Sequence, residues 1–194
     1  MDATIRAASP DDAAAIAGVH VTSLRASATD LLPAHLTPIV LPPADAAPRA
    51  RAWKRWIERK RTSTLVSLAG ATVTGFCTLH PATDDARAST GAGGAENSGQ
   101  EAAGASAGAA CAEIASFYVL PSEWRRGTGR SLGGRALAEA RARGFAEVML
   151  WVLETNARAR RFYESLGFQP DGASKVFLER PYASWRELRY RRAV

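Results

Sequence analysis

Residues 120–138, LPSEWRRGTGRSLGGRALA, decide the fold, because within them a strand-like apolar run gives way to an amphipathic helical one. The run AEIASFYVL predicts a strand, and SLGGRALAEARARG predicts a helix with its apolar residues on one face. Between the two, Gly127 and Gly129 let a ligand approach the backbone closely. Because a helix start also presents free N–H groups that favour anions, the stretch predicts a phosphate cradle.

Two nucleotide-binding patterns fail at this turn. The third glycine of the dinucleotide fingerprint would fall at Leu132, and no Lys-Ser or Lys-Thr pair follows as a P-loop requires. What remains is a turn whose successive amides, from Arg125 to Ser131, can close around a pyrophosphate. Arg126 and Arg130 add positive charge to that of Arg125. The structural alternative is a tight glycine turn that only starts a helix.

The N-terminal half alternates strand and helix signals. Residues 3–7 predict a short strand, and Ser9 followed by Pro10 is typical of a helix start. The runs STLVSLAG and TVTGFCTLH are rich in β-formers, and Ala69-Gly70-Ala71 between them predicts a hairpin. In RAWKRWIERKR, the tryptophans are spaced for one helix face and the charges for the other.

The C-terminal half repeats the alternation. VMLWVL has no polar residue and predicts a strand buried on both faces. Asn156 can cap a following helix that ends at Gly167. SKVFLER and WRELRYRR can supply two closing strands. The elements together predict a mixed α/β domain around one sheet.

Composition limits the organisation of the chain. Twenty of the 29 residues from 82 to 110 are Ala, Gly or Ser, and none is Leu, Ile, Val or aromatic, so this stretch cannot offset its ordering entropy by burial. We therefore expect a single domain over residues 1–194 with a flexible insert at about 82–110. Cys77 and Cys111 lack metal-ligand spacing, so we expect no metal. The N-terminus shows no signal peptide and no run is long enough to span a bilayer, which favours a cytoplasmic protein without membrane contact.

Two segments together identify a family. EIASFYVLPSEWRRGTGRSLGGRAL and NARARRFYESLGF resemble the fourth strand with its pyrophosphate turn, and the late tyrosine-bearing helix, of the GNAT superfamily of acetyl-CoA-dependent N-acetyltransferases. TIRAASPDDAAAIAGVHVTSLRAS is similar to the opening strand and helix of that family. The resemblance implies an α+β fold with a central mixed, mostly antiparallel sheet of about seven strands flanked by helices. One departure is Trp124, because the usual turn begins with Arg or Gln at this position.

The resemblance also implies acetyl-CoA as co-substrate and a primary amine as acceptor. The residues expected to hold acetyl-CoA are Tyr118, Val119, Arg125, Arg126, Gly127, Thr128, Gly129, Arg130, Ser131, Asn156 and Arg158. Asn156 would hydrogen-bond the pantetheine arm, and the amide near Val119 would stabilise the oxyanion.

Proton transfers point to two catalytic candidates. An amine must be neutral to attack, so a base has to take its proton, and Glu113 is the candidate. A departing thiolate leaves more readily when it is protonated, and Tyr163 is the candidate donor. The structural alternatives are a solvent-facing glutamate and an aromatic residue that packs in the core.

The net charge of +6 and the pI near 9.9 leave other partners open. A basic nucleic-acid-binding module is the alternative from another class, although a helix packed through its tryptophans is the more common outcome of RAWKRWIERKR. A protein that binds acyl-CoA as a regulatory ligand without turnover is a third reading. Exposed edge strands near the C-terminus are compatible with a homodimer.

Overall fold

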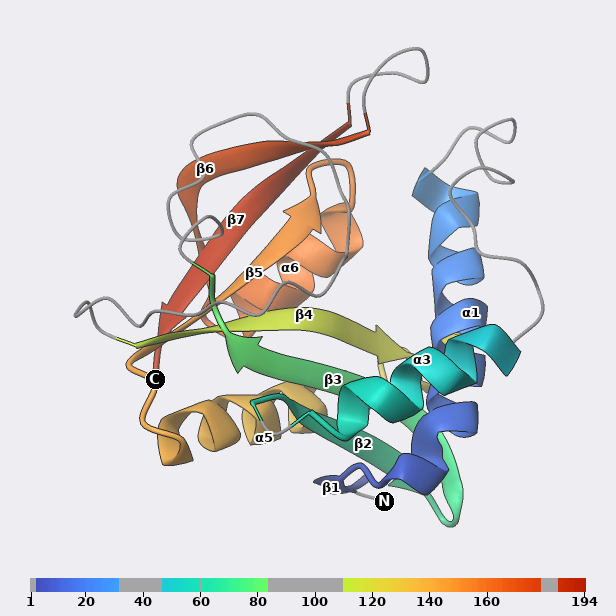
Figure 1. Cartoon of the computed structure of the whole chain (residues 1–194). Helices are drawn as coiled ribbons and strands as arrows, with labels where there is room; N and C mark the ends of the chain where they lie inside the picture. Colours follow the sequence, from blue (N-terminus) through green and yellow to red (C-terminus); the bar gives the residue numbers. More distant parts are fainter. Residues whose placement is uncertain (1–2, 32–46, 60, 84–109, 179–184) are drawn as a thin grey trace. The chain divides into compact units, whose positions relative to one another are not determined.

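The computed structural model describes residues 3–31, 47–59, 61–83, 110–178 and 185–194 (Figure 1). Most of the proline-rich segment and of the Ala/Gly/Ser-rich insert lies outside these residues. The elements, in chain order, are β1 (Thr4–Ala7), η1 (Pro10–Asp12), α1 (Ala13–Leu31), α3 (Ala47–Ile57), β2 (Ser63–Ala69), β3 (Thr72–Pro81), β4 (Cys111–Val119), η2 (Pro121–Glu123), α5 (Thr128–Ala142), β5 (Glu147–Leu153), α6 (Ala157–Ser165), β6 (Gln169–Leu178) and β7 (Trp185–Ala193).

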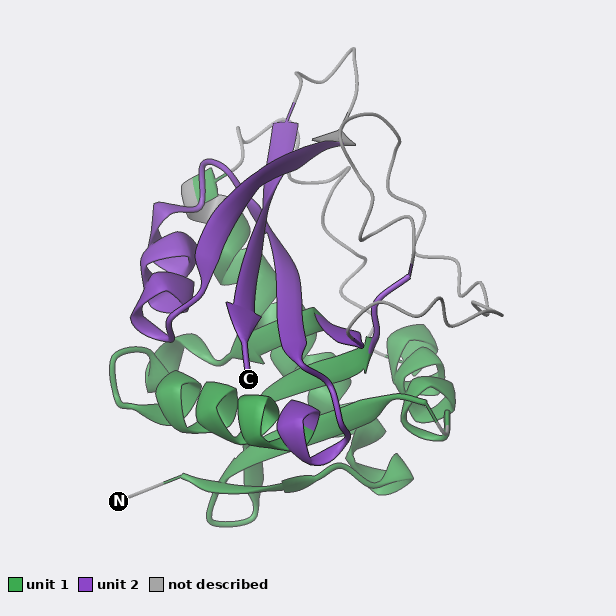
Figure 2. Ribbon diagram, turned by 90° about the vertical axis from the view of Figure 1, so that its left-hand side faces the viewer, with its two compact units in different colours: residues 1–80, 114–139 green, residues 81–113, 140–194 purple. Residues whose placement is uncertain are grey.

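The predicted mixed α/β fold with about seven strands is confirmed: the described residues hold seven strands and four α-helices. The chain divides into two compact units, coloured separately in Figure 2. Unit 1 comprises residues 1–80 and 114–139, and unit 2 comprises residues 81–113 and 140–194. The single-domain organisation stays a prediction.

Unit 1 is built on the strand order β1-β2-β3-β4. β1 and β2 pair antiparallel with Ile5 opposite Ser67, and β2 and β3 pair antiparallel with Val66 opposite Phe76. Gly70 takes a left-handed φ of 61° in the predicted hairpin between β2 and β3. This local turn signal therefore sets the register of the two strands.

Helices cover both faces of the unit 1 strands. α1 and α3 pack over the face of Val66 and Phe76, where Trp53 from α3 is buried. α5 meets the opposite face, since Ser63 donates a hydrogen bond to Glu139 at 3.2 Å and side chains three positions apart in a strand point to opposite sides. The apolar face of each helix is thus buried against strands, as its periodicity predicts.

The tryptophans of α3 belong to the packing of unit 1. Trp53 is 8% exposed and lies edge-on to Phe76, with ring centroids 4.9 Å apart. Trp56 is half-buried, with the His80 ring at its edge and the Arg59 guanidinium 4.9 Å from its centroid. These rings therefore do not form an open stacking platform of the kind that single-stranded nucleic acids use.

Unit 2 contains the strand order β5-β7-β6, with both pairs antiparallel. Val148, Met149, Leu150 and Val152 are buried in β5, and Trp151 is half-buried. Both faces of the strand thus carry buried residues, as predicted, although burial is incomplete at Trp151. Its ring faces the charged Lys175 and Arg189, with Nζ and Cζ 4.4 and 5.6 Å from the centroid.

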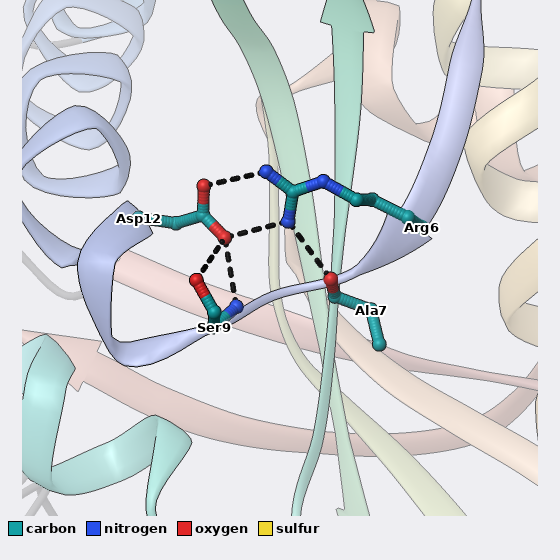
Figure 3. A network of polar contacts seen from close by, with 4 residues as sticks. All are labelled: Arg6, Ala7, Ser9 and Asp12. Atoms are coloured by element: carbon teal, nitrogen blue, oxygen red, sulfur yellow. Dashed lines mark hydrogen bonds and ion pairs between the residues drawn. The ribbon is translucent and has the colours of Figure 1, made fainter.

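A polar network ties β1 to the start of α1 (Figure 3). Both guanidinium nitrogens of Arg6 donate to the Asp12 carboxylate, at 2.7 and 2.8 Å. The same carboxylate accepts from the backbone N–H of Ser9 at 2.7 Å and from its hydroxyl at 3.2 Å. These hydrogen bonds, with that from Arg6 as the largest contribution, lower the pKa of Asp12 to about 2. Ser9 and Asp12 thus form a capping box at the start of the 3-10 turn η1, which precedes α1.

Asp12→Asn is expected to lower the free energy of unfolding at pH 7 by about 1–2 kcal/mol, because it removes the ion pair with the half-exposed Arg6. The folded pKa of Asp12 lies below its ordinary 3.8, so the stabilisation is present above about pH 4 and is lost as the pH falls toward 2. Urea unfolding of both proteins from pH 7 to pH 2 measures this convergence. Asp11→Asn, at the exposed neighbour, should change little; an equal loss from both would contradict the assignment.

Gly75 in β3 allows a close approach of β4. A Cβ atom at this position would lie 2.8 Å from Ser67 Oγ, 2.9 Å from the carbonyl oxygen of Tyr118 and 3.1 Å from Val119 Cγ2. Backbone atoms of β4 cannot yield as a flexible side chain can, so the position excludes any larger residue.

Gly75→Ala is expected to lower the thermal stability by about 1–3 kcal/mol through overpacking against the Tyr118 carbonyl. The matched variant is Gly134→Ala in α5, where an added Cβ meets nothing within 4 Å. That substitution should stabilise by up to about 1 kcal/mol, because alanine favours a helix interior. Calorimetric unfolding of the two variants checks the opposite signs, and a stable Gly75→Ala would contradict the close approach.

Candidate active site

The predicted phosphate turn leads from η2 into α5 within unit 1. Arg125 and Gly127 both have left-handed backbone, with φ of 61° and 89°. Arg125 is the one non-glycine residue with positive φ in the described part of the chain. An added Cβ at Gly127 would meet no atom within 4 Å, so the space beside this backbone is open. The Arg126 amide already donates to the Glu123 carbonyl at 3.3 Å, so an anion at this turn would be met by the other backbone N–H groups.

The first turn of α5 supplies further N–H groups. Amides at Thr128, Gly129 and Arg130 lie where a helix has no acceptor of its own, whereas the Ser131 amide already donates to the Gly127 carbonyl at 3.0 Å. The hydroxyl of Thr128 is buried and donates to the Glu123 carboxylate at 3.1 Å. The predicted group is therefore brought together in the turn, with Thr128 acting through its backbone.

The guanidinium groups add charge at the edge of the turn. Arg125, Arg126 and Arg130 are all exposed. Such side chains can reach a bound polyphosphate without the cost of burying an unpaired charge.

The end of β4 is held from two sides. The carbonyl oxygen of Val119 accepts a hydrogen bond from Ser23 Oγ in α1 at 3.0 Å and another from Trp124 Nε1 at 2.8 Å. The Leu120 amide donates to the Thr74 carbonyl in β3 at 2.8 Å. Trp124, which departs from the expected Arg or Gln, thus binds the protein's own backbone.

Tyr118 lies in an aromatic cluster beside Val119. Its ring stacks on Phe76 with centroids 5.5 Å apart, and His20 lies 4.5 Å away. Burial, followed by the positive charge of the nearby Arg49, lowers the pKa of His20 to about 4, so the imidazole is neutral at pH 7. Arg49 lies 3.2 Å from its Nδ1, which makes Nδ1 the acceptor. His20 is therefore part of the packing.

α6 in unit 2 carries three of the predicted residues. Asn156 caps it, since its side-chain oxygen accepts from the Ala159 amide at 3.0 Å. Tyr163 is 9% exposed, with Phe162 and Phe168 at centroid distances of 5.3 and 6.0 Å. Arg158 is exposed on the first turn. The capping role of Asn156 is thus confirmed, and its role toward pantetheine stays a prediction.

β7 fixes the position of α6. The hydroxyl of the fully buried Tyr190 donates to Glu164 at 2.9 Å and accepts from Arg160 Nε at 3.0 Å. Arg192 donates to the carbonyl of Leu166 at the end of the helix. Because Glu164 adjoins Tyr163, the tyrosine is held through the backbone of α6.

Glu113 belongs to a charged face of unit 2 that includes a second carboxylate. Burial raises the pKa of Glu187, and the negative charge of Glu113 raises it further, while Lys175 at 3.3 Å opposes the shift. Glu113 is half-buried, and its role as a base, like the alternative of a solvent-facing glutamate, stays a prediction. Glu187 was not expected from sequence, although the alternation in WRELRYRR puts Glu187, Arg189 and Arg191 on one face.

Two further observations concern cofactors and membranes. Within the described ranges, no three His, Cys, Asp or Glu side chains gather as a metal site would require. None of the helices in those ranges is long and apolar enough to cross a membrane.

Relatives in sequence match a short segment. A mycothiol acetyltransferase of Streptosporangium roseum is 50% identical over 58 residues, which are 28% of this chain and 17% of that protein. The mycothiol acetyltransferase of Beutenbergia cavernae is 50% identical over 62 residues, which are 32% of this chain and 21% of that protein. The chain thus matches about a fifth of the length of these relatives.

Solved structures match along the whole chain and show the fold. The PaiA N-acetyltransferase of Thermoplasma acidophilum, in complex with coenzyme A, has a TM-score of 0.68 at 16% identity, over 100% of both chains. A Salmonella typhimurium protein with its cofactor acetyl-CoA has a TM-score of 0.64 at 20% identity, over 100% of this chain and 94% of that chain. The ribosomal-protein-S18-alanine N-acetyltransferase of Escherichia coli has a TM-score of 0.60 at 18% identity, over 99% and 94%.

The sequence model of the acetyltransferase (GNAT) family matches residues 30–168, which include the whole turn and α6. The chain therefore belongs to the GNAT family of acetyltransferases, which are acyltransferases that use acetyl-CoA.

Proposed function

We propose that this protein transfers the acetyl group of acetyl-CoA to a primary amine. The observation that carries the proposal is the left-handed turn at Arg125 and Gly127, which has open space beside Gly127 and leads into the first turn of α5. A pyrophosphate is the part of acetyl-CoA whose charge and size suit such a turn. Arg125, Arg126 and Arg130 would add charge-assisted hydrogen bonds to it.

The proposed reaction requires four roles from the residues of this chain. Glu113 accepts the proton that the attacking ammonium must lose, directly or through water. The Val119 amide stabilises the negative oxygen that forms when the nitrogen adds to the thioester carbon. The C–S bond then breaks, and Tyr163 donates its proton to the departing thiolate. Asn156 and Arg158 would orient the pantetheine arm from the start of α6.

The interaction of Glu187 with Glu113 supports the proposal of a general base on this face of unit 2. Burial raises the pKa of Glu187, and the negative charge of Glu113 raises it further. Lys175, whose Nζ lies 3.3 Å from Glu187, opposes this shift. A change of charge at Glu113 is therefore felt at Glu187.

The acceptor in this proposal is a primary amine. The mycothiol acetyltransferases match a short segment, so the substrate in their name is not transferred to this chain. Nucleic acid binding through α3 loses support from the structure, because Trp53 is buried and Trp56 is covered by His80 and Arg59. A cytoplasmic location belongs to the same proposal.

Gly127→Glu is expected to abolish coenzyme A binding, since it puts a side chain and a negative charge into the open space beside a left-handed backbone. Isothermal calorimetry with coenzyme A and acetyl-CoA measures the loss, which should be at least about 100-fold in Kd. The matched control is Gly70→Glu, which makes the same change at a left-handed glycine in the β2–β3 hairpin. Equal binding by the two variants would refute the pyrophosphate site.

Tyr163→Phe and Glu113→Gln are expected to lower kcat by about 100-fold each while leaving the Kd for coenzyme A within about two-fold, because each removes only a proton-transfer group. Turnover is followed as thiol release with a panel of primary amines and peptide N-termini. Glu113→Gln should also lower the pKa of Glu187, since it removes a neighbouring negative charge. Full turnover in both variants would show that these residues are not catalytic.

A further inference from the structure

The carbonyl oxygen of Val119 joins three parts of unit 1. Ser23 donates to it from α1 at 3.0 Å, and Trp124 donates to it from the residue before the turn at 2.8 Å. A carbonyl oxygen has two lone pairs, so these side chains use its full capacity and hold its direction. Ser23 is itself 2% exposed, so water does not readily compete for this bond.

Trp124 also precedes Arg125, the residue with the least favourable backbone conformation in the turn. The next residue, Arg125, is left-handed at φ 61°, which a residue with a Cβ adopts only where its surroundings hold it. On the far side, the Arg126 amide donates to the Glu123 carbonyl at 3.3 Å, and the Glu123 carboxylate accepts from Thr128. The turn is thus tied to α5 through Glu123 and to β4 through Trp124.

We propose that Trp124 is a positioning residue whose indole N–H, together with the Ser23 hydroxyl, keeps the end of β4 in register with the pyrophosphate turn. This inference rests on the proposed function, in which Val119 serves the acetyl end of acetyl-CoA and residues 125–131 serve its pyrophosphate. A ligand that reaches both places gains affinity only if their separation is held constant. Trp124 should therefore affect the affinity for a ligand that reaches both places, but not the affinity for a ligand that reaches only one of them.

The resemblance to other family members fits this role. Arg and Gln, the usual residues at this position, also carry N–H donors on their side chains. Trp124 keeps a donor there but adds a rigid ring with only two side-chain torsions, so less conformational entropy is lost when the bond forms. The departure in sequence thus preserves the hydrogen-bonding capacity of the position.

The test compares two ligands on Trp124→Phe, which keeps a ring and removes the N–H donor. ADP carries a pyrophosphate without the pantetheine arm, whereas coenzyme A carries both. We expect the Kd for coenzyme A to rise about five-fold and the Kd for ADP to stay within about two-fold, as measured by calorimetry. An equal rise for both ligands would mean that Trp124 only stabilises the turn, and no change in either would also overturn the proposal.

A double-mutant cycle tests whether the two hydrogen bonds to the Val119 carbonyl act together. It needs only the affinity for coenzyme A and not that for ADP. Ser23→Ala and Trp124→Phe each leave Val119 with one donor, whereas the double variant leaves a carbonyl without either. The double variant should therefore lose more affinity than the product of the two single losses. Losses that simply multiply would show that Ser23 and Trp124 act independently.

Trp56→Phe is the matched control, because the Trp56 indole nitrogen is buried and has no hydrogen-bond partner among the described residues. It should leave the Kd for coenzyme A unchanged, and an effect equal to that of Trp124→Phe would overturn the proposal. Failure of this inference is separable from failure of the proposed function. If Gly127→Glu loses coenzyme A and Trp124→Phe does not, the pyrophosphate site stands and only the positioning role is wrong.

Discussion

The left-handed backbone at Arg125 and Gly127 is the constraint on which the ligand chemistry of unit 1 depends. These two residues turn the chain from η2 into α5. The glycine adopts this backbone at little cost, whereas the arginine needs support from both sides. Trp124 and Glu123 supply that support, which explains why polar and aromatic side chains adjoin a glycine turn.

In the proposed function, the cofactor site is built mainly from backbone. Anion recognition would come from N–H groups at a helix start and a turn, so it would tolerate changes of side chain at the surface. Side chains then act indirectly: Thr128 donates to Glu123, and Ser23 donates to the carbonyl of Val119. Substitutions at such positions would alter the geometry of the site without touching the ligand.

Features encoded within a few residues were predictable from sequence. The hairpin at Gly70, the cap at Asn156 and the turn at Gly127 each depend on local backbone preferences, and the structure confirms all three elements. Features that depend on strand order were not predictable. β7, the last strand in sequence, lies between β5 and β6, so Glu187 comes near Glu113 and Trp151 faces Lys175. The partner of Trp124 was missed because nothing in a sequence shows that an indole will turn back to a carbonyl five residues earlier.

The position of β7 also has a consequence for synthesis of the chain. β5 and β6 both pair with β7, and α6 is held by the hydroxyl of Tyr190 and by Arg192. Because a chain emerges from the ribosome N-terminal end first, unit 2 cannot complete its sheet until these late residues are released. Unit 1, whose residues all precede residue 140, can fold earlier. The helix that carries Tyr163 would therefore be the last part to become ordered in a newly made molecule, and premature termination within β7 would leave α6 without the contacts of Tyr190 and Arg192.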